Sequence, residues 1–194
     1  MHRIATPIIL AVLPCLAGCL GTAPEPPKCW NVEGGGAAYA GEAPAEPAPA
    51  VKLMQLDVRA PYNGTRFAVL RSDGSVAFDS CNSFAAPPAA LLKGAAYDLI
   101  SSSGKFGRVV NASSSAGAPF SMEITVTRLA LDCRSEGRRD ASAAVALTLV
   151  RGRNDVSFSV GEASMPAADG NYTAAFSGAF AGAMSAALHR LSVR

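Results

Sequence analysis

Few side chains in this sequence could carry out acid–base or nucleophilic chemistry. Histidine, the group most often used for proton transfer near neutral pH, occurs only twice among the 194 residues, as His2 and His189. A Ser-His-Asp or Cys-His site needs a histidine within hydrogen-bonding reach of its nucleophile. We expect His2 to leave with an N-terminal signal and His189 to interact with the C-terminal carbonyls of a helix. The sequence therefore predicts no catalytic residues, and the protein is not expected to be an enzyme.

The remaining acidic and metal-binding side chains show no pattern typical of a site. The cysteines lack the close spacing of zinc ligands, so a zinc site that combines them with His189 is a minor alternative. The carboxylates are scattered over predicted turns and polar strand faces, where solvated side chains are expected. A glycosidase-type pair stays open as an alternative because no two of them stand out. We predict no metal and no cofactor.

The N-terminal segment indicates chemistry of a different kind. Arg3 precedes an apolar run over residues 4–16, and Leu16-Ala17-Gly18-Cys19 follows. A basic start, a short apolar run and a small-residue cleavage site are typical of a secretory signal, and this run is too short to span a bilayer as a permanent helix. Its last four residues resemble a bacterial lipobox. Residues 1–18 are therefore predicted to be a lipoprotein signal peptide, cleaved between Gly18 and Cys19, with acyl chains attached to Cys19. The alternative is an ordinary signal peptide in which the cysteine is coincidental.

Three cysteines remain for the folded part of the exported chain. They are Cys29, Cys81 and Cys133. Export leads to an oxidising compartment, in which one disulfide can form and one thiol is left over. We favour Cys81 with Cys133 as the candidate disulfide because both belong to the folded domain, while Cys29 is close to the tether. Pairings that involve Cys29 stay open.

Residues 19–50 are predicted to form a tether. The segment is rich in Pro, Gly and Ala and has too little apolar content to fold alone. A short apolar island near residues 29–32 contains Trp30, the only tryptophan, and we expect it to add a strand to the domain core. Without the signal the chain is close to neutral and has no block of Lys or Arg, which argues against nucleic-acid binding.

Residues 51–194 carry the strand and helix patterns of one domain. Strand patterns cover residues 51–58, 66–71, 75–79, 106–110, 122–126, 145–149 and 156–160. We expect Asp73-Gly74 to form a hairpin turn. Helices are predicted from Pro87-Pro88 to Gly104, and over residues 172–191 after an N-cap at Asn171. The expected buried strand faces include Met54, Leu56 and Val58 in the first strand, and Val156, Phe158 and Val160 in the last.

This order of elements predicts an α+β fold. It is a single domain with a mainly antiparallel sheet and two helices packed on one face.

The same order of elements is similar to that of a known family. Its features are the lipobox, the aromatic island at Trp30, a strand that ends near Ala60-Pro61-Tyr62, a hairpin that begins at Arg66, the segments 82–92 and 103–106, and an Ala-rich final helix. From Lys28 onward the chain resembles the ABC-type transport auxiliary lipoproteins, the PqiC-like family. It departs from the family pattern at Phe84, where a tryptophan is common, and in its long linker at residues 34–50.

The resemblance implies an accessory role without catalytic residues. Lipoproteins of this family work with ABC transporters that contain mammalian-cell-entry subunits and move phospholipids or other hydrophobic molecules across the periplasm. The expected partners are the membrane, through the acyl chains, and periplasmic subunits of such a transporter. We expect a lipid-anchored position in the cell envelope, facing the periplasm. Leu20 is not the aspartate that retains lipoproteins in the inner membrane of enteric bacteria, which favours the outer membrane. The alternative is a structural envelope lipoprotein that binds other envelope proteins without a transporter.

Overall fold

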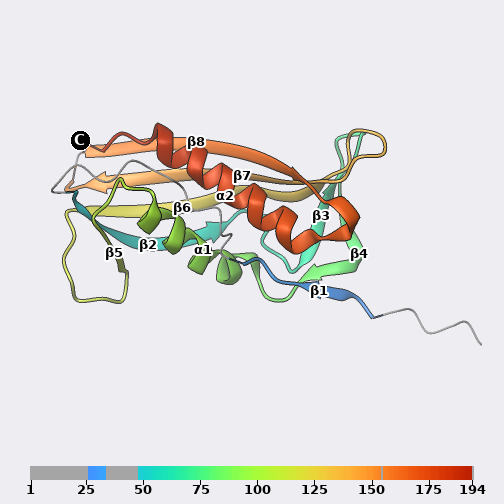
Figure 1. The fold of residues 1–194 in the computed structure, drawn as a ribbon, viewed down its shortest axis with the longest axis horizontal. Coiled ribbons are helices and arrows are strands. Elements are labelled where there is room, and N and C mark those ends of the chain that lie inside the picture. The colour runs from blue at the N-terminus through green and yellow to red at the C-terminus, as the bar shows by residue number, and fades with distance from the viewer. Residues whose placement is uncertain (1–25, 34–47, 154, 194) are drawn as a thin grey trace, which may run out of the picture.

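The computed structural model of the chain describes residues 26–33, 48–153 and 155–193 (Figure 1). The predicted signal peptide, with Gly18 and Cys19, lies outside the described residues. In chain order the elements are β1 (Lys28–Trp30), β2 (Ala50–Val58), β3 (Arg66–Leu70), β4 (Val76–Phe84), α1 (Pro88–Ser102), β5 (Arg108–Asn111), β6 (Phe120–Asp132), β7 (Asp140–Arg151), β8 (Asp155–Pro166), the 3-10 turn η3 (Ala168–Gly170) and α2 (Tyr172–Arg190). Neither described helix is long and apolar enough to cross a bilayer.

The eight strands form one sheet that branches at β6. On one side β6 pairs antiparallel with β7, which pairs antiparallel with β8. On its other side β6 pairs parallel with β2 through its first half and with β3 through its last residues. β2 also pairs parallel with β5, β3 pairs antiparallel with β4, and β4 pairs parallel with β1. The sheet is therefore mixed. The longest ladders are antiparallel, as predicted, but four of the pairings are parallel: β1 with β4, β2 with β5, and both β2 and β3 with β6.

Both helices cover the same face of the sheet, which confirms the predicted α+β architecture (Figure 1). α2 packs on β7 and β8, α1 packs on β2, and the helices contact each other. The expected ends are confirmed: Pro88 begins α1, and Gly104 follows its end with a φ of 69°. At the start of α2 the Asn171 side chain accepts a hydrogen bond from the backbone N–H of Ala174.

The last strand turns its large residues away from the core. Val156, Phe158 and Val160 are 58%, 65% and 45% exposed. The prediction that they form the buried face of β8 is therefore wrong. Small residues face α2 instead, and a Cβ added at Gly161 would overlap the carbonyl oxygen of Ala183. The helix lies so close to β8 that only small side chains fit between them.

The first long strand changes face part-way along. Val51 and Leu53 are buried, and the register with β6 then shifts between Leu53 and Gln55. A β-bulge of this kind reverses which residues point inward. Val58 is buried as predicted, but Met54 is 44% exposed, so its expected place in the core is wrong.

The predicted hairpin is confirmed. β3 and β4 pair antiparallel around Asp73-Gly74, with a φ of 83° at Gly74. The Asp73 carboxylate accepts hydrogen bonds from the backbone N–H and the hydroxyl of Ser75. These bonds lower the pKa of Asp73 from its ordinary value of 3.8.

Candidate functional site

The cysteines of the described chain do not form a common site. Cys29, Cys81 and Cys133 are free thiols in the structure, so it does not contain the candidate Cys81–Cys133 disulfide. Cys81 lies on β4, Cys133 directly follows β6, and β3 lies between these two strands. Strands separated by a third are about 10 Å apart, whereas a disulfide needs Cα atoms closer than about 7 Å. The sheet order that separates them could not be read from cysteine spacing.

The acidic and histidine side chains do not gather either. Within residues 26–33, 48–153 and 155–193, no three His, Cys, Asp or Glu side chains lie together as potential metal ligands. His189 lies in the last turn of α2, as the sequence indicated. The predicted absence of catalytic groups stays a prediction, because it rests on the sequence.

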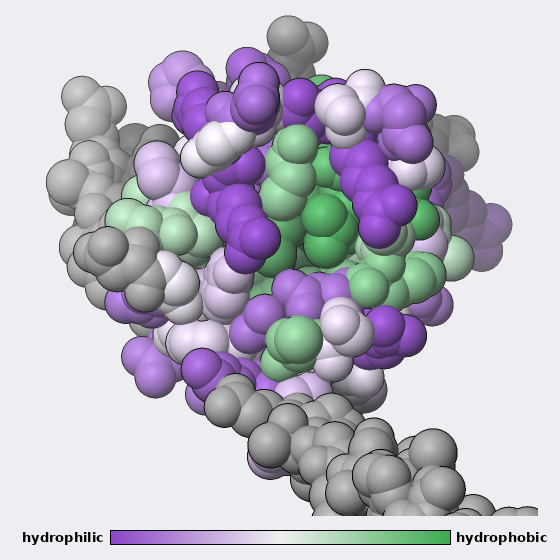
Figure 2. Space-filling model, turned by 90° about the vertical axis from the view of Figure 1, so that its right-hand side faces the viewer, coloured by the Kyte–Doolittle hydropathy of each residue, from purple (hydrophilic) through white to green (hydrophobic). Residues whose placement is uncertain are grey.

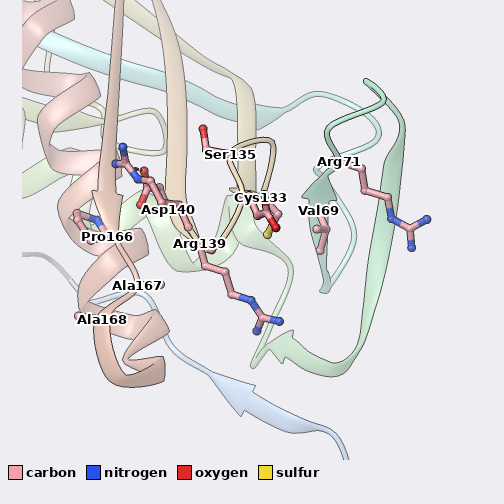
Figure 3. Close-up of a pocket in the computed structure, with 12 residues that line it drawn as sticks. Val69, Arg71, Cys133, Ser135, Arg139, Asp140, Pro166, Ala167 and Ala168 are labelled. Carbon is pink, nitrogen blue, oxygen red and sulfur yellow. Dashed lines mark hydrogen bonds and ion pairs between the residues drawn. The ribbon is translucent and has the colours of Figure 1, made fainter.

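The clearest concave surface is an open hollow of about 770 Å³ at one end of the sheet. Its walls come from the end of β3, the β6–β7 loop, and the segment that joins β8 to η3 (Figure 3). It is lined by Val69, Arg71, Cys133, Ser135, Glu136, Gly137, Arg138, Arg139, Asp140, Pro166, Ala167 and Ala168. We call it the end hollow. Figure 2 shows this end of the molecule, with hydrophobic surface at the centre and hydrophilic side chains around it.

The β6–β7 loop supplies most of the charge at the end hollow. Gly137 takes a φ of 72°, and the Arg138 N–H donates to the Ser135 carbonyl at 3.1 Å, which closes a tight turn. Two surface ion pairs flank this turn. Arg134 Nη2 lies 2.6 Å from Asp132 Oδ2, and Arg138 Nη2 lies 2.6 Å from Asp140 Oδ2. The hydrogen bond from Arg134 is the main cause that lowers the pKa of Asp132.

Arg139 differs from its two neighbours because it forms no ion pair among the described residues. Its side chain projects from the loop into the open space between β7 and β3 (Figure 3). Its Nη1 donates to the Tyr172 hydroxyl at 3.4 Å, a contact that raises the pKa of the guanidinium. Its backbone carbonyl accepts from the Ala167 N–H at 2.9 Å, so the main chain of the loop is held while the charged end stays accessible.

Tyr172 links the end hollow to the tether strand. Its ring packs edge-on against Trp30, with ring centroids 5.2 Å apart. Trp30 Nε1 also donates to Asn82 Oδ1 at 2.9 Å, and β1 pairs parallel with β4. The prediction that Trp30 anchors a short added strand on the domain is confirmed. The segment that leads to the predicted anchor thus enters the fold beside the end hollow.

The opposite wall of the end hollow carries a second free guanidinium and a thiol. Arg71 follows β3 and has no ion-pair partner among the described residues; its head points away from Arg139 (Figure 3). Cys133 is half-buried, and this burial is the main cause that raises the pKa of its thiol. A raised pKa leaves a smaller fraction of thiolate at neutral pH. The arrangement is suited to binding a negatively charged group next to apolar surface.

Comparisons with known proteins give a likeness at the level of the fold. No protein-family model and no curated protein matches this sequence. The crystal structure of a Xanthomonas campestris protein given as DUF330 matches with a TM-score of 0.55 at 17% identity, over 74% of this chain and 83% of that one. An uncharacterised protein matches with a TM-score of 0.55 at 16% identity, over 71% and 86%. The fold is shared. PelC of Paraburkholderia phytofirmans, crystallised as a dodecamer, reaches a TM-score of 0.47 at 12% identity, over 79% and 96%.

The residues of the end hollow are far apart in the sequence, and no sequence pattern indicated that they form one site. Arg134, Arg138 and Arg139 are conspicuous in the sequence between the strand patterns at residues 122–126 and 145–149. Arg71 and Val69 are more than sixty positions earlier. They reach the same hollow because β3 pairs with the last residues of β6, a parallel pairing that strand patterns do not reveal.

Proposed function

We propose that this chain is a membrane-anchored accessory lipoprotein of an ABC-type system with mammalian-cell-entry subunits, which moves phospholipids or other hydrophobic molecules across the periplasm. The observation that carries the proposal is the tether strand. The segment that follows the lipobox pairs as β1 with β4 and packs Trp30 against Tyr172. An acyl chain on Cys19 would therefore hold the whole domain close to a membrane surface, which raises its effective concentration toward partners there.

Other features support an accessory role over a catalytic one. The end hollow offers apolar surface and the guanidinium of Arg139, which forms no ion pair among the described residues and therefore suits binding. The fold shared with the Xanthomonas campestris DUF330 structure agrees with the order of elements that suggested the family. Attachment to the outer membrane, facing the periplasm, is part of the proposal.

A structural envelope lipoprotein is the second candidate. The observation that favours it is the exposed apolar row of Val156, Phe158 and Val160 on β8, an edge strand. Such a row suits contact with another protein whether or not that protein belongs to a transporter.

Crosslinking in the native cells distinguishes the two candidates. The tagged protein is crosslinked, purified and analysed by mass spectrometry, beside a Cys19→Ala variant that cannot be acylated. Recovery of a mammalian-cell-entry subunit or the ATPase–permease with the anchored protein only is the expected result. If only other envelope proteins are recovered, although transporter subunits are detected in the lysate, the structural role replaces the proposed one.

A further inference from the structure

The length of the tether limits which part of the domain can meet the membrane. Lys28, the first residue of β1, follows Cys19 by nine positions. Fully extended backbone covers at most about 3.5 Å per residue, so Lys28 lies within about 30 Å of the acylated residue. β6 and β7 have 13 and 12 residues, and strands of this length extend for about 40 Å. With the sheet upright on the membrane, the end that holds β1 can reach the surface and the opposite end cannot.

The end hollow lies at the end that holds β1. Trp30 contacts Tyr172, and Tyr172 contacts Arg139. Figure 1 shows β1 at the same end of the molecule as the β3–β4 turn and the β6–β7 loop. A membrane that carries the anchor therefore approaches the rim of the end hollow.

The rim of the end hollow offers arginines to such a surface. Arg139 and Arg71 form no ion pair among the described residues, and of the two lining carboxylates the exposed Glu136 is the one that forms none there either. Arg134 and Arg138 keep 56% and 65% of their side chains exposed. Surface pairs of this kind contribute little, so their guanidiniums can exchange a carboxylate for a phosphate. The planar guanidinium matches two phosphate oxygens at once.

The floor of the end hollow is apolar. Val69, Cys133, Pro166 and Ala167 line it between the charged walls. A volume of about 770 Å³ is in the range of small-molecule sites and accommodates a phospholipid headgroup with its glycerol. Phosphate and apolar glycerol esters are adjacent in a phospholipid, as Arg139 and this floor are adjacent here.

We propose that the end hollow binds the headgroup of an anionic phospholipid in the membrane that carries the anchor, with the phosphate on Arg139 and the glycerol esters over Val69 and Cys133. The inference rests on the lipid anchor of the proposed function and adds a headgroup class and a docking orientation. It does not require a transporter.

Labelling of native thiols tests the inference. The acylated full-length mature protein is reconstituted into vesicles of phosphatidylcholine, with or without phosphatidylglycerol, and treated with a water-soluble maleimide. Mass spectrometry then gives the labelling rate of Cys133 in each kind of vesicle. Phosphatidylglycerol is expected to slow Cys133 labelling about fivefold, the factor for roughly one arginine at an anionic surface. The Arg139→Gln variant is expected to lose this protection of Cys133. In Arg153→Gln, which removes the same charge from the β7–β8 turn at the opposite end, it stays.

Each outcome decides the inference. Equal Cys133 labelling in both vesicles, or protection that survives Arg139→Gln, overturns it. Protection by glycerol 3-phosphate in phosphatidylcholine vesicles, as strong as that by the lipid, would mean a site for a soluble anion and overturns it also. An intact mass without acyl chains removes the anchor, and both proposals then fall. An acylated protein without Cys133 protection overturns this inference alone and leaves the transport role to the crosslinking experiment.

Discussion

At the scale of single residues, Gly161 decides how closely α2 approaches the sheet. It is buried in β8, and the backbone of α2 at Ala183 occupies the space where a side chain would begin. Gly94 gives a matched contrast, because it lies exposed in the interior of α1 with no atom within 4 Å of an added Cβ. The same substitution at these two positions therefore tests the packing directly.

We expect Gly161→Ala to lower the free energy of unfolding by about 2–3 kcal/mol, because the helix must move away from the strand. Gly94→Ala is expected to raise it by roughly 0.5–1 kcal/mol through helix propensity. Urea denaturation followed by circular dichroism measures both. Equal and small effects at the two positions would contradict the close contact between α2 and β8.

The ion pair of Asp132 gives stability a dependence on acid pH. The pKa of Asp132 is lowered from 3.8 in the folded protein, mainly by the hydrogen bond from Arg134. The folded state therefore binds the proton less readily than the unfolded state. The ion pair makes its full contribution to the free energy of unfolding above the pKa that Asp132 has in the unfolded state. This contribution is lost as the pH falls from about 4 through the lower pKa that Asp132 has in the folded protein.

Between pH 7 and pH 3 the wild-type protein should thus lose more free energy of unfolding than Asp132→Asn. The difference is expected to stay below about 1 kcal/mol because Arg134 is largely exposed. Urea titrations of both proteins across this range measure it. Parallel pH curves would show that the pair contributes nothing.

At the scale of elements, β8 and α2 place their phenylalanines in opposite environments, one in solvent and one in the core. Phe158 points to the open face and is 65% exposed. Phe176 is 1% exposed and packs between Phe67 and Phe84, with ring centroids 4.9 and 5.0 Å away. Replacing Phe176 should therefore lower the free energy of unfolding far more than replacing Phe158, although both lie in regular secondary structure.

Phe176→Ala is expected to cost about 3–5 kcal/mol, the range for an aromatic residue removed from a core. Phe158→Ala is expected to cost less than about 1 kcal/mol. Thermal or urea unfolding of the two variants makes the comparison. A large loss in Phe158→Ala would mean that another surface covers β8 in solution.

The helices and strands also show which features of the fold the sequence could predict. Capping and turn residues act locally, so Pro88, Asn171 and Asp73-Gly74 gave correct ends for both helices and the hairpin. The direction in which a strand faces depends on what packs against it. The alternation in β8 was visible, but its apolar half faces solvent because α2 needs small neighbours. The face of β2 changed at a bulge that no local pattern marks.

At the scale of the whole molecule, the core joins the tether strand, the sheet and both helices. Buried side chains from Val32 to Leu191 form one hydrophobic cluster, against which Trp30 packs. As the only tryptophan, Trp30 reports whether β1 is docked. A domain of this size with one core is expected to unfold in a single cooperative step.

Trp30 fluorescence and far-ultraviolet circular dichroism should therefore give the same midpoint in urea. Fluorescence reports the docking of β1 against Tyr172, and circular dichroism reports the sheet and helices as a whole. Global analysis of both curves from the same samples provides the measurement. A fluorescence change at lower urea would show that β1 detaches before the domain unfolds.

The end hollow depends on this larger scale, which is why sequence patterns could not reveal it. Its walls belong to β3, the β6–β7 loop and the approach to α2, and they meet only after the sheet has branched at β6. The arginines of the loop can be recognised in the sequence between two strand patterns. The apolar floor beneath them cannot, because Val69 and Cys133 come from different strands.

The short strand β1 has a mechanical consequence for an anchored protein. If Cys19 carries acyl chains, as proposed, drag on the domain is transmitted to them through Lys28, at the outer end of a strand that runs parallel to β4. A pull along that strand loads its backbone bonds together, as a shear, along with the bond from the Ala85 N–H to the Trp30 carbonyl at 2.8 Å and the indole bond to Asn82. A pull across the strand would open the same bonds one at a time. A domain anchored in this way would resist tension best when it stands away from the membrane along the line of β1.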